Sequence, residues 1–434
     1  SSSVPAGTSR RDFLKTGTAA VAGTVATLGL QSAVYAGGDD VIKVALIGCG
    51  GRGTGAAKQA LSADPQAKLV AMADAFPDRL ERSLKDVQGA HGERVDVPPE
   101  RQFVGLDAYK KAIAAADVVL LATPPGFRPA HLKAAVEAGK HIFCEKPVAV
   151  DGPGIRSVFE TVEQAKQKGL SLVSGLCWRY HPALRATFEQ VQNGSIGETV
   201  ALQCSYFTNG LWHVDRTPEM SGLEWQIRNW LYFTWLSGDH NVEQHVHSLD
   251  KMTWAMGDQP PLSATGTGGR QVRTDPKFGH IYDHFAVEYE YPNGVKAFAR
   301  CRQQDGAQVD VTDHLFGTKG ACHIASHRTF IKGEQNWRYT GENGDMYQLE
   351  HDELFAGIRN GTPINNGRYM TVSTMMAIMG RMAAYTGQTV TWKQALESKE
   401  DLTPSVYSED LAPPHYPAEL DVPQVPMPGL TQFV

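Results

Sequence analysis

After residue 40, short and almost continuous apolar runs alternate with amphipathic segments. The apolar runs lie at 41–47, 67–74, 117–121, 140–144 and 170–174. The segments with helical periodicity include 54–62, 128–139 and 152–168. A continuous apolar run is typical of a parallel strand that is covered on both faces. The alternation predicts right-handed crossovers and a doubly wound, α/β Rossmann domain over residues 37–175.

The pattern changes beyond residue 176. Strand patterns lie at 199–210, 280–303 and 310–325, and helical patterns lie at 348–360 and 372–386. The second strand pattern turns at Asn293-Gly294, a dipeptide typical of a tight hairpin. Antiparallel hairpins after a parallel domain predict an α+β domain over residues 176–400, with a large open, mostly antiparallel sheet.

Both ends of the chain differ from this pattern. Arg10 and Arg11 precede a weakly apolar stretch and small residues that reach Ala36, which is the layout of a secretory signal. The string SRRDFLK resembles the twin-arginine export signal, so we expect a signal peptide at 1–36 and a periplasmic protein. The proline-rich segment 401–434 predicts an extended arm that lies on the protein or on a partner subunit.

Composition narrows the classes of function. The formal net charge of −6 leaves no basic excess to neutralise phosphates, so nucleic acid is not an expected partner. No apolar run beyond residue 37 is long enough for a membrane helix, and no membrane anchor is expected. The six cysteines lie in or beside apolar runs and form no CxxC pair, which favours buried free thiols.

A glycine turn follows the first apolar run. Gly48, Gly50 and Gly53 form GxGxxG between a predicted strand and a predicted helix. In that context the first glycine permits the turn, the second lets the backbone approach a pyrophosphate, and the third lets the helix pack against the strand. We expect Gly51 and Arg52, within the same turn, to contact the dinucleotide as well.

Asp74 ends the second predicted strand, where a carboxylate can accept hydrogen bonds from a ribose diol. A carboxylate there repels a 2′-phosphate, so the sequence favours NAD over NADP. Arg79 and Arg82 follow closely and keep NADP open as an alternative.

Polar residues also follow the later strands of the predicted parallel sheet. Thr123, Pro124, Glu145 and Lys146 fall at strand carboxyl ends, where such sheets bind their ligands, and we expect all four to contact the cofactor. A lysine beside a dinucleotide can stabilise a developing alkoxide. The alternative is a lysine that merely lies at the surface.

Together with the glycine turn, the Asp74 strand and the ATPP turn, Glu145-Lys146-Pro147 resembles the glucose-fructose oxidoreductase/inositol dehydrogenase/rhizopine-catabolism (Gfo/Idh/MocA) family. The resemblance implies a Rossmann domain followed by an open-sheet domain and oxidation of a sugar or cyclitol hydroxyl with NAD or NADP. It also implies a homo-oligomer, a dimer or tetramer, and places Lys146 beside the nicotinamide. By the same resemblance, Arg179 contacts the cofactor and Tyr180 and His181 face the substrate; a helix-capping role for these three is the alternative.

The stretch GDHNVEQHVHSLD at 238–250 resembles the family's catalytic helix. The resemblance makes His247 the catalytic base, and Glu243, four residues earlier, lies on the same face of a helix and can orient it. Two departures from the family pattern, Glu243 for Asp and His245 for Gly, leave the substrate open. A metal site would also need His240, but this spacing spreads the side chains around a helix, so no metal is expected. Purely structural histidines remain possible.

These features predict reversible oxidation of a secondary alcohol in which His247 removes the proton and Lys146 stabilises the alkoxide. Trp230 and Tyr232, from an aromatic-rich stretch, are candidate substrate contacts, with core packing as the alternative. The rival functions are an NAD-dependent glycosidase or lyase that works through a transient keto-sugar, and a binding protein without catalysis.

Overall fold

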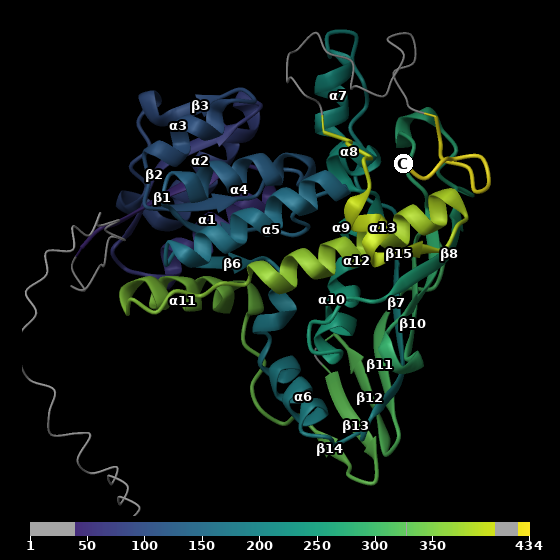
Figure 1. The fold of residues 1–434 in the computed structure, drawn as a ribbon. Helices are drawn as coiled ribbons and strands as arrows, with labels where there is room; N and C mark the ends of the chain where they lie inside the picture. The colour runs from purple at the N-terminus through teal and green to yellow at the C-terminus, as the bar shows by residue number, and fades with distance from the viewer. Residues whose placement is uncertain (1–39, 327, 404–423) are drawn as a thin grey trace, which may run out of the picture. The chain divides into compact units, whose positions relative to one another are not determined.

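The computed structural model describes residues 40–326, 328–403 and 424–434, which all belong to one compact unit (Figure 1). The predicted signal peptide lies outside these residues, as does much of the predicted arm at 401–434. The last residues return to the molecule. The carbonyl of Pro426 accepts a hydrogen bond from the Tyr282 hydroxyl at 2.9 Å, and Gly429 N donates to Thr386 O at 2.9 Å.

Parallel strands form the first sheet. They are β1 (Ile42–Ile47), β2 (Ala67–Asp74), β3 (Gln102–Val104), β4 (Val118–Leu121), β5 (His141–Cys144) and β6 (Leu172–Ser174). Their order, β3-β2-β1-β4-β5-β6, and their parallel pairing are those of the doubly wound Rossmann fold. The order reverses direction between β1 and β4, where such a fold binds its ligand. The prediction of this fold is confirmed.

Helices connect and cover these strands. They are α1 (Gly51–Ala63), α2 (Pro77–His91), α3 (Ala108–Ala114), α4 (Arg128–Glu137) and α5 (Gly152–Gln167), with short 3₁₀ turns η1 (Gly92–Arg94), η2 (Pro99–Arg101) and η3 (Pro125–Phe127). Strands β4 and β5 are buried along their whole length, as expected for apolar runs covered on both faces. The remaining 3₁₀ turns are η4 (Cys177–Tyr180), η5 (Trp230–Tyr232), η6 (Pro276–Phe278) and η7 (Pro292–Gly294).

The second sheet is larger and mixed. Its strands, in spatial order, are β14 (Trp337–Arg338), β13 (Arg328–Gly333), β12 (Gly320–Ala325), β11 (Asp310–Gly317), β7 (Thr199–Thr208), β10 (Lys296–Gln303), β9 (His284–Glu290), β8 (Ser263–Gly269) and β15 (Val390–Thr391). The β7–β10 pair is parallel and the other neighbours are antiparallel. The predicted open, mostly antiparallel sheet is confirmed.

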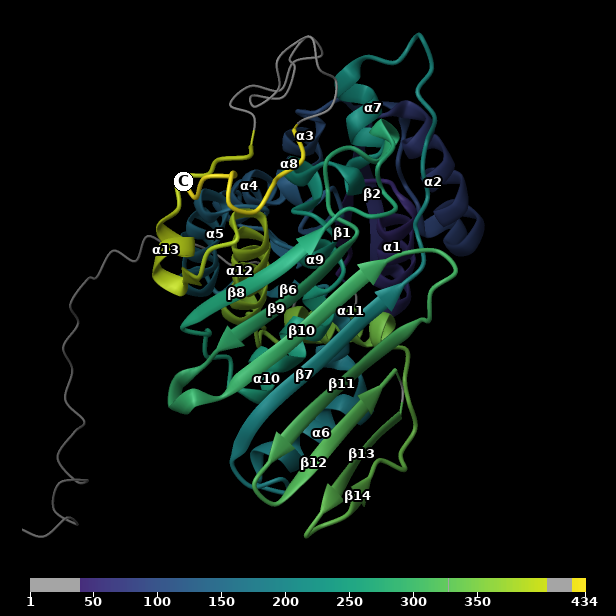
Figure 2. The same cartoon turned by 90° about the vertical axis from the view of Figure 1, so that its right-hand side faces the viewer.

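One face of this sheet is covered by helices. The later helices are α6 (Pro182–Gln192), α7 (Gly222–Arg228), α8 (Thr234–Ser237), α9 (His240–Glu243), α10 (Val246–Ala255), α11 (Met346–Arg359), α12 (Gly367–Thr386) and α13 (Trp392–Glu397). Figure 2 shows α6, α10 and α12 behind the sheet. Buried and exposed positions alternate along β9 and β10, which is typical of a sheet with one solvated face.

Helices α11 and α12 join the two sheets. Helix α12 is almost entirely buried and packs against α5 on one side and β8 on the other, whereas α11 packs against α1. The main chain at Asn365 also forms a parallel bridge to Leu172 in β6. In Figure 1, α11 and α12 lie below the Rossmann domain, against which they pack.

Two sequence expectations differ from the structure. The patterns did not predict β8 or β13–β15; β8, with sequence SATGTGG, carries little of the apolar alternation that marks a strand. The stretch expected as one helix through 238–250 is two helices, α9 and α10. No helix of the described residues is long and apolar enough to cross a bilayer.

Candidate active site

A cavity of about 380 Å³ lies along the carboxyl ends of β1, β2 and β4. It is lined by most of the residues predicted to contact a dinucleotide: Gly48, Gly50, Gly51, Arg52, Gly53, Asp74, Thr123 and Pro124. Trp230, a candidate substrate contact, lines the cavity from the second part of the chain. The glycine turn, the end of the Asp74 strand and the ATPP turn therefore meet in one pocket, where a Rossmann fold receives its cofactor. Glu145 and Lys146, which were also expected to contact the cofactor, are not among the residues that line it.

The glycine turn fits a dinucleotide. A methyl group at Gly53 would lie 1.9 Å from the carbonyl oxygen of Gly48, so only glycine allows α1 to pack this close to the end of β1. At Gly50 and Gly51 a methyl group would meet no protein atom within 4 Å. The space above these two backbones is thus open to a phosphate, and α1 begins there with unpaired N–H groups.

The Asp74 carboxylate binds the main chain of the glycine turn and of the segment that follows β2. Its Oδ2 accepts a hydrogen bond from Cys49 N at 2.6 Å, and its Oδ1 accepts one from Phe76 N at 2.9 Å. Burial raises the pKa of Asp74, although these two bonds and the charge of Arg79 oppose the shift. Arg79 lines the same pocket, so the structure keeps both the carboxylate that favours NAD and a cation that tolerates a 2′-phosphate.

Lys146, at the end of β5, is joined to α9. Its Nζ donates hydrogen bonds to the main-chain oxygen of Glu243 at 2.6 Å and to Glu243 Oε1 at 3.0 Å. Burial alone would lower the pKa of Lys146, but the charges of Glu243 and Glu145 outweigh it and hold the pKa above its usual value. The lysine is therefore a fixed cation at a strand end, not a freely moving surface group.

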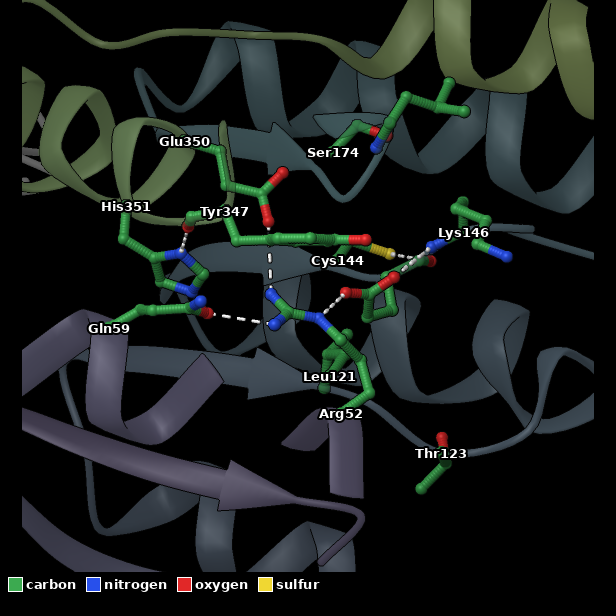
Figure 3. A network of polar contacts seen from close by, with 12 residues as sticks. Arg52, Gln59, Leu121, Thr123, Cys144, Lys146, Ser174, Tyr347, Glu350 and His351 are labelled. Atoms are coloured by element: carbon green, nitrogen blue, oxygen red, sulfur yellow. Dashed lines mark hydrogen bonds and ion pairs between the residues drawn. The ribbon is translucent and has the colours of Figure 1, made fainter. Parts of the chain in front are cut away.

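An arginine links the glycine turn to this lysine (Figure 3). Arg52 Nε donates to Oε1 of Glu145, while its other nitrogens reach Gln59 at 2.9 Å and Glu350 at 3.1 Å. The predicted cofactor residues Arg52 and Glu145 thus contact each other, and Arg52 alone of the two lines the pocket. Burial, followed by the charge of Glu145, raises the pKa of Glu350 well above its ordinary value.

The helix that was expected to carry Glu243 and His247 together is interrupted. His245 N donates to His240 O, five residues back, and His247 N donates to Gln244 O, three residues back. In the described chain no hydrogen bond or ion pair joins Glu243 to His247; the carboxylate faces Lys146 instead. The structure therefore does not support the prediction that Glu243 orients the imidazole along one helical face, because the regular hydrogen-bond ladder breaks between them.

His247 nevertheless lies in the same electrostatic neighbourhood. Burial, and then the positive charges of Lys146 and Lys251, lower its pKa well below the ordinary value, which keeps the imidazole neutral. Its Nδ1 is buried without a hydrogen-bond partner, although the side chain is partly exposed. A neutral imidazole near a lysine ammonium can accept a proton.

The connection after β6 does not reach the pocket. The guanidinium of Arg179 is paired with Asp250 at 2.8 Å and Asp258 at 2.6 Å, and it stacks on Trp254 and Tyr369. The expectation that Arg179 contacts the cofactor is therefore not supported by its position. Both carboxylates are more than 70 positions away from Arg179 in the sequence, so their contact with it could not be predicted from local patterns.

Tyr180, His181 and Tyr232 are also committed to packing. The Tyr180 hydroxyl donates to Asn366 Oδ1 at 2.6 Å, and His181 is fully buried where α6 begins. The Tyr232 hydroxyl donates to the main-chain oxygens of Leu211 and Trp212. None of the three lines the cavity, so their predicted substrate contacts are not supported. His181 stands at the N-cap position of α6, but its side chain makes no capping hydrogen bond there.

Several residues of the site were missed in the sequence. Tyr206, on β7, is within electrostatic reach of Lys146 and Glu243, and burial raises its pKa. Arg228 lines the cavity, and Glu350 pairs with Arg52. Trp212, from the aromatic-rich stretch already considered for the substrate, lines the cavity too. The alternation of apolar and polar residues along β7 could have predicted that Tyr206 lies on the inner face of the sheet. The sequence near Arg228 and Glu350 contains no pattern that predicts which residues they contact.

Metal-binding geometry is not seen in the described part of the chain, where no group of three or more His, Cys, Asp or Glu side chains is placed to hold an ion. All six cysteines are free and buried. His245, one of the residues considered for a metal, instead contacts Asn241 Oδ1 through Nδ1 at 3.0 Å and lies 3.4 Å from Cys204 Sγ.

Comparison with known proteins agrees with this geometry. Residues 42–175 match the oxidoreductase family with an NAD-binding Rossmann fold, and residues 184–323 match the GFO/IDH/MocA C-terminal domain. An inositol 2-dehydrogenase of Rhizobium meliloti (strain 1021) is 27% identical over 289 residues, which are 66% of this chain and 76% of that protein.

Two further relatives are informative. A 2,7-anhydro-N-acetylneuraminate hydratase of Escherichia coli (strain K12) is 25% identical over 239 residues, which are 54% of this chain and 59% of that protein. The crystal structure of aldose-aldose oxidoreductase from Caulobacter crescentus, complexed with glycerol, has a TM-score of 0.63 at 18% identity and covers 81% of this chain and all of that one. The chain belongs to the Gfo/Idh/MocA family of oxidoreductases, and its Rossmann domain is of the kind that binds a nicotinamide dinucleotide.

Proposed function

We propose that this oxidoreductase interconverts a secondary hydroxyl and a carbonyl on a sugar or cyclitol. The observation that carries the proposal is the Lys146–Glu243 pair: a largely buried, charged lysine that follows Glu145, the partner of Arg52, and lies within electrostatic reach of a neutral histidine. The inositol dehydrogenase and aldose-aldose oxidoreductase relatives support a polyhydroxylated substrate.

The residues divide the work of proton transfer. His247, kept neutral by burial and by the two lysines, accepts the proton of the substrate hydroxyl. Lys146 uses two of its three N–H bonds on Glu243, so the third is free to donate to the developing alkoxide. The nicotinamide, when bound, supplies the hydride acceptor. Glu243 positions the lysine and holds its charge.

The pocket residues of this chain support a dinucleotide, with NAD preferred. Gly48, Gly50, Gly51 and Gly53 would hold the pyrophosphate at the start of α1, and Thr123 and Pro124 would bound the site from β4. Asp74 would accept hydrogen bonds from the ribose diol. Arg79 leaves NADP as the second candidate, and a measurement of the bound species decides between them.

If the protein is exported in the folded state, as we propose, its cofactor should remain bound. The twin-arginine-like string at residues 9–15 favours export of a folded protein to the periplasm. Dinucleotides are made in the cytoplasm, so an exported enzyme would load its cofactor before crossing. We therefore propose slow cofactor release, reoxidation in place by a second substrate, and a homodimer or homotetramer as the assembly.

A second candidate is elimination, hydration or hydrolysis through a transient keto-sugar. The hydratase relative favours it, since that protein is named for a hydration, which is a reaction without net redox. The two candidates differ in the state of the cofactor after turnover. Net accumulation of reduced cofactor supports the oxidoreductase, and product release without it supports the alternative.

The first experiment is to denature the purified protein and identify the released dinucleotide by mass. Addition of aldoses and cyclitols to the intact protein then tests which of them reduces the bound cofactor. Protein that binds a dinucleotide but changes no sugar would instead indicate a binding protein.

A further inference from the structure

The segment between β7 and α9, residues 209–239, reaches from the second sheet to the Rossmann pocket. Trp212, Ile227, Arg228 and Trp230 of this segment line the same cavity as the glycine turn and Asp74. One side of the cavity is therefore formed by this segment, which comes after the Rossmann domain in the sequence.

Arg228, the last residue of α7, fastens this segment to the Rossmann domain. Its two terminal nitrogens contact the Asp78 carboxylate of α2 at 2.9 and 3.1 Å, and its Nε contacts Glu224 at 2.9 Å. The guanidinium carbon also lies 4.0 Å from the centroid of the Phe76 ring. A bidentate ion pair together with a stacked aromatic ring holds an arginine more firmly than a single exposed ion pair does.

The segment behind Arg228 is itself well held. The Asn229 side chain accepts a hydrogen bond from Val214 N at 2.8 Å and donates one to Val214 O at 2.9 Å. Ser221 caps the start of α7 through Glu224 N at 3.0 Å. Arg228 is thus presented by a folded unit, and its contacts fix the position of the end of α7 against the start of α2.

The contacts of Arg228 fall at a defined end of the pocket. Phe76 and Asp78 lie two and four residues after Asp74, the residue placed for the adenosine ribose in a Rossmann fold. Phe76 and Arg228 both line the cavity there, together with Arg79. A ligand in this end is enclosed between α2 and α7.

We infer that Arg228, Phe76 and Asp78 form a clasp that retains the dinucleotide by closing α7 over its adenosine end. The inference rests on the proposed function, because it takes the pocket to hold a dinucleotide. Release of the cofactor then requires the Arg228–Asp78 pair to separate, whereas chemistry at Lys146 does not.

The test measures cofactor release from the full chain. Protein loaded with NADH is mixed with excess NAD, and loss of bound-NADH fluorescence gives the dissociation rate for the wild type, Arg228→Ala and Asp78→Asn. Both variants should release NADH at least about tenfold faster, as loss of a bidentate pair and its stacking implies. The double variant Asp78→Arg with Arg228→Asp should recover part of the slow release.

Arg185→Ala is the matched control. It removes a comparable two-bond pair, with Glu353, that is remote from the pocket lining, and should leave the release rate unchanged. Unchanged release in Arg228→Ala, or equal acceleration in Arg185→Ala, would overturn the clasp. Wild-type protein that binds no dinucleotide at all would overturn the proposed function, and with it the clasp.

Discussion

Lys146 Nζ donates to both the main-chain oxygen and the carboxylate of Glu243, at 2.6 and 3.0 Å. This pair connects the end of a Rossmann strand to the short helix α9, across 97 residues of sequence. It fixes the lysine ammonium while leaving one of its protons for a substrate.

Glu243→Gln keeps the main-chain acceptor and removes the charge that raises the pKa of Lys146. The pKa of Lys146 should therefore fall, because the close opposite charge that favours its ammonium form is gone. Since a neutral lysine no longer stabilises an alkoxide, the alkaline loss of activity should begin at lower pH than in the wild type. The pH profile of single-turnover cofactor reduction checks this, with the exposed-residue variant Glu163→Gln as control; coincident profiles would contradict it.

The base is expected to stay active in mild acid. The pKa of His247 is lowered by burial and by Lys146 and Lys251, so the neutral form persists as the pH falls through 6.5, about where an ordinary histidine becomes half protonated. The double variant Lys251→Met with Asp313→Asn removes one of these charges without leaving a buried carboxylate alone. Its acid limb should move to higher pH. An ordinary titration near 6.5 in the wild type would show that another group is the base.

Asp74→Ser should weaken NAD and favour NADP relative to it. The substitution removes the repulsion of a 2′-phosphate while Arg79 stays in the pocket, so the ratio of the two dissociation constants should shift on the order of tenfold. Binding titrations with both dinucleotides measure the ratio. A wild-type protein that already carries NADP would show that Asp74 does not select the cofactor.

Arg179 should matter for stability and not for cofactor affinity. Arg179→Met leaves Asp250 buried without its partner, which should lower the free energy of unfolding by about 3–5 kcal/mol. Dinucleotide affinity of the folded variant should match the wild type, and Arg179→Met with Asp250→Asn should regain part of the stability. Urea unfolding and a binding titration separate the two effects; a large loss of affinity in a stable variant would restore the role first expected of Arg179.

Features that depend on residues close together in the sequence could be predicted from the sequence alone. The apolar runs of β1, β4 and β5, the turn at Gly48–Gly53 and the acid at Asp74 depend on local periodicity and on backbone space, and all lie where they were expected. The hairpin turn at Asn293-Gly294 is of the same kind, since both residues take positive φ.

Features that depend on distant partners were not predictable in this way. Glu243 looked like a partner for His247 because a regular helix puts residues four apart on one face. The bond from His245 N to His240 O interrupts that helix, and the buried contact of His245 with Asn241 accompanies the break. Arg179 likewise looked free for a cofactor because neither Asp250 nor Asp258 is near it in sequence.

The most direct test of the central claim uses the bound nicotinamide of wild-type protein and of Lys146→Ala. The near-ultraviolet absorbance of the reduced ring is followed while donor and acceptor carbohydrates are added in turn, without free dinucleotide. We predict alternating reduction and reoxidation in the wild type, and reduction at least about a hundredfold slower in Lys146→Ala with its cofactor still bound. Reduction at the wild-type rate in Lys146→Ala, or a wild-type signal that depends strictly on added NAD, would contradict the account.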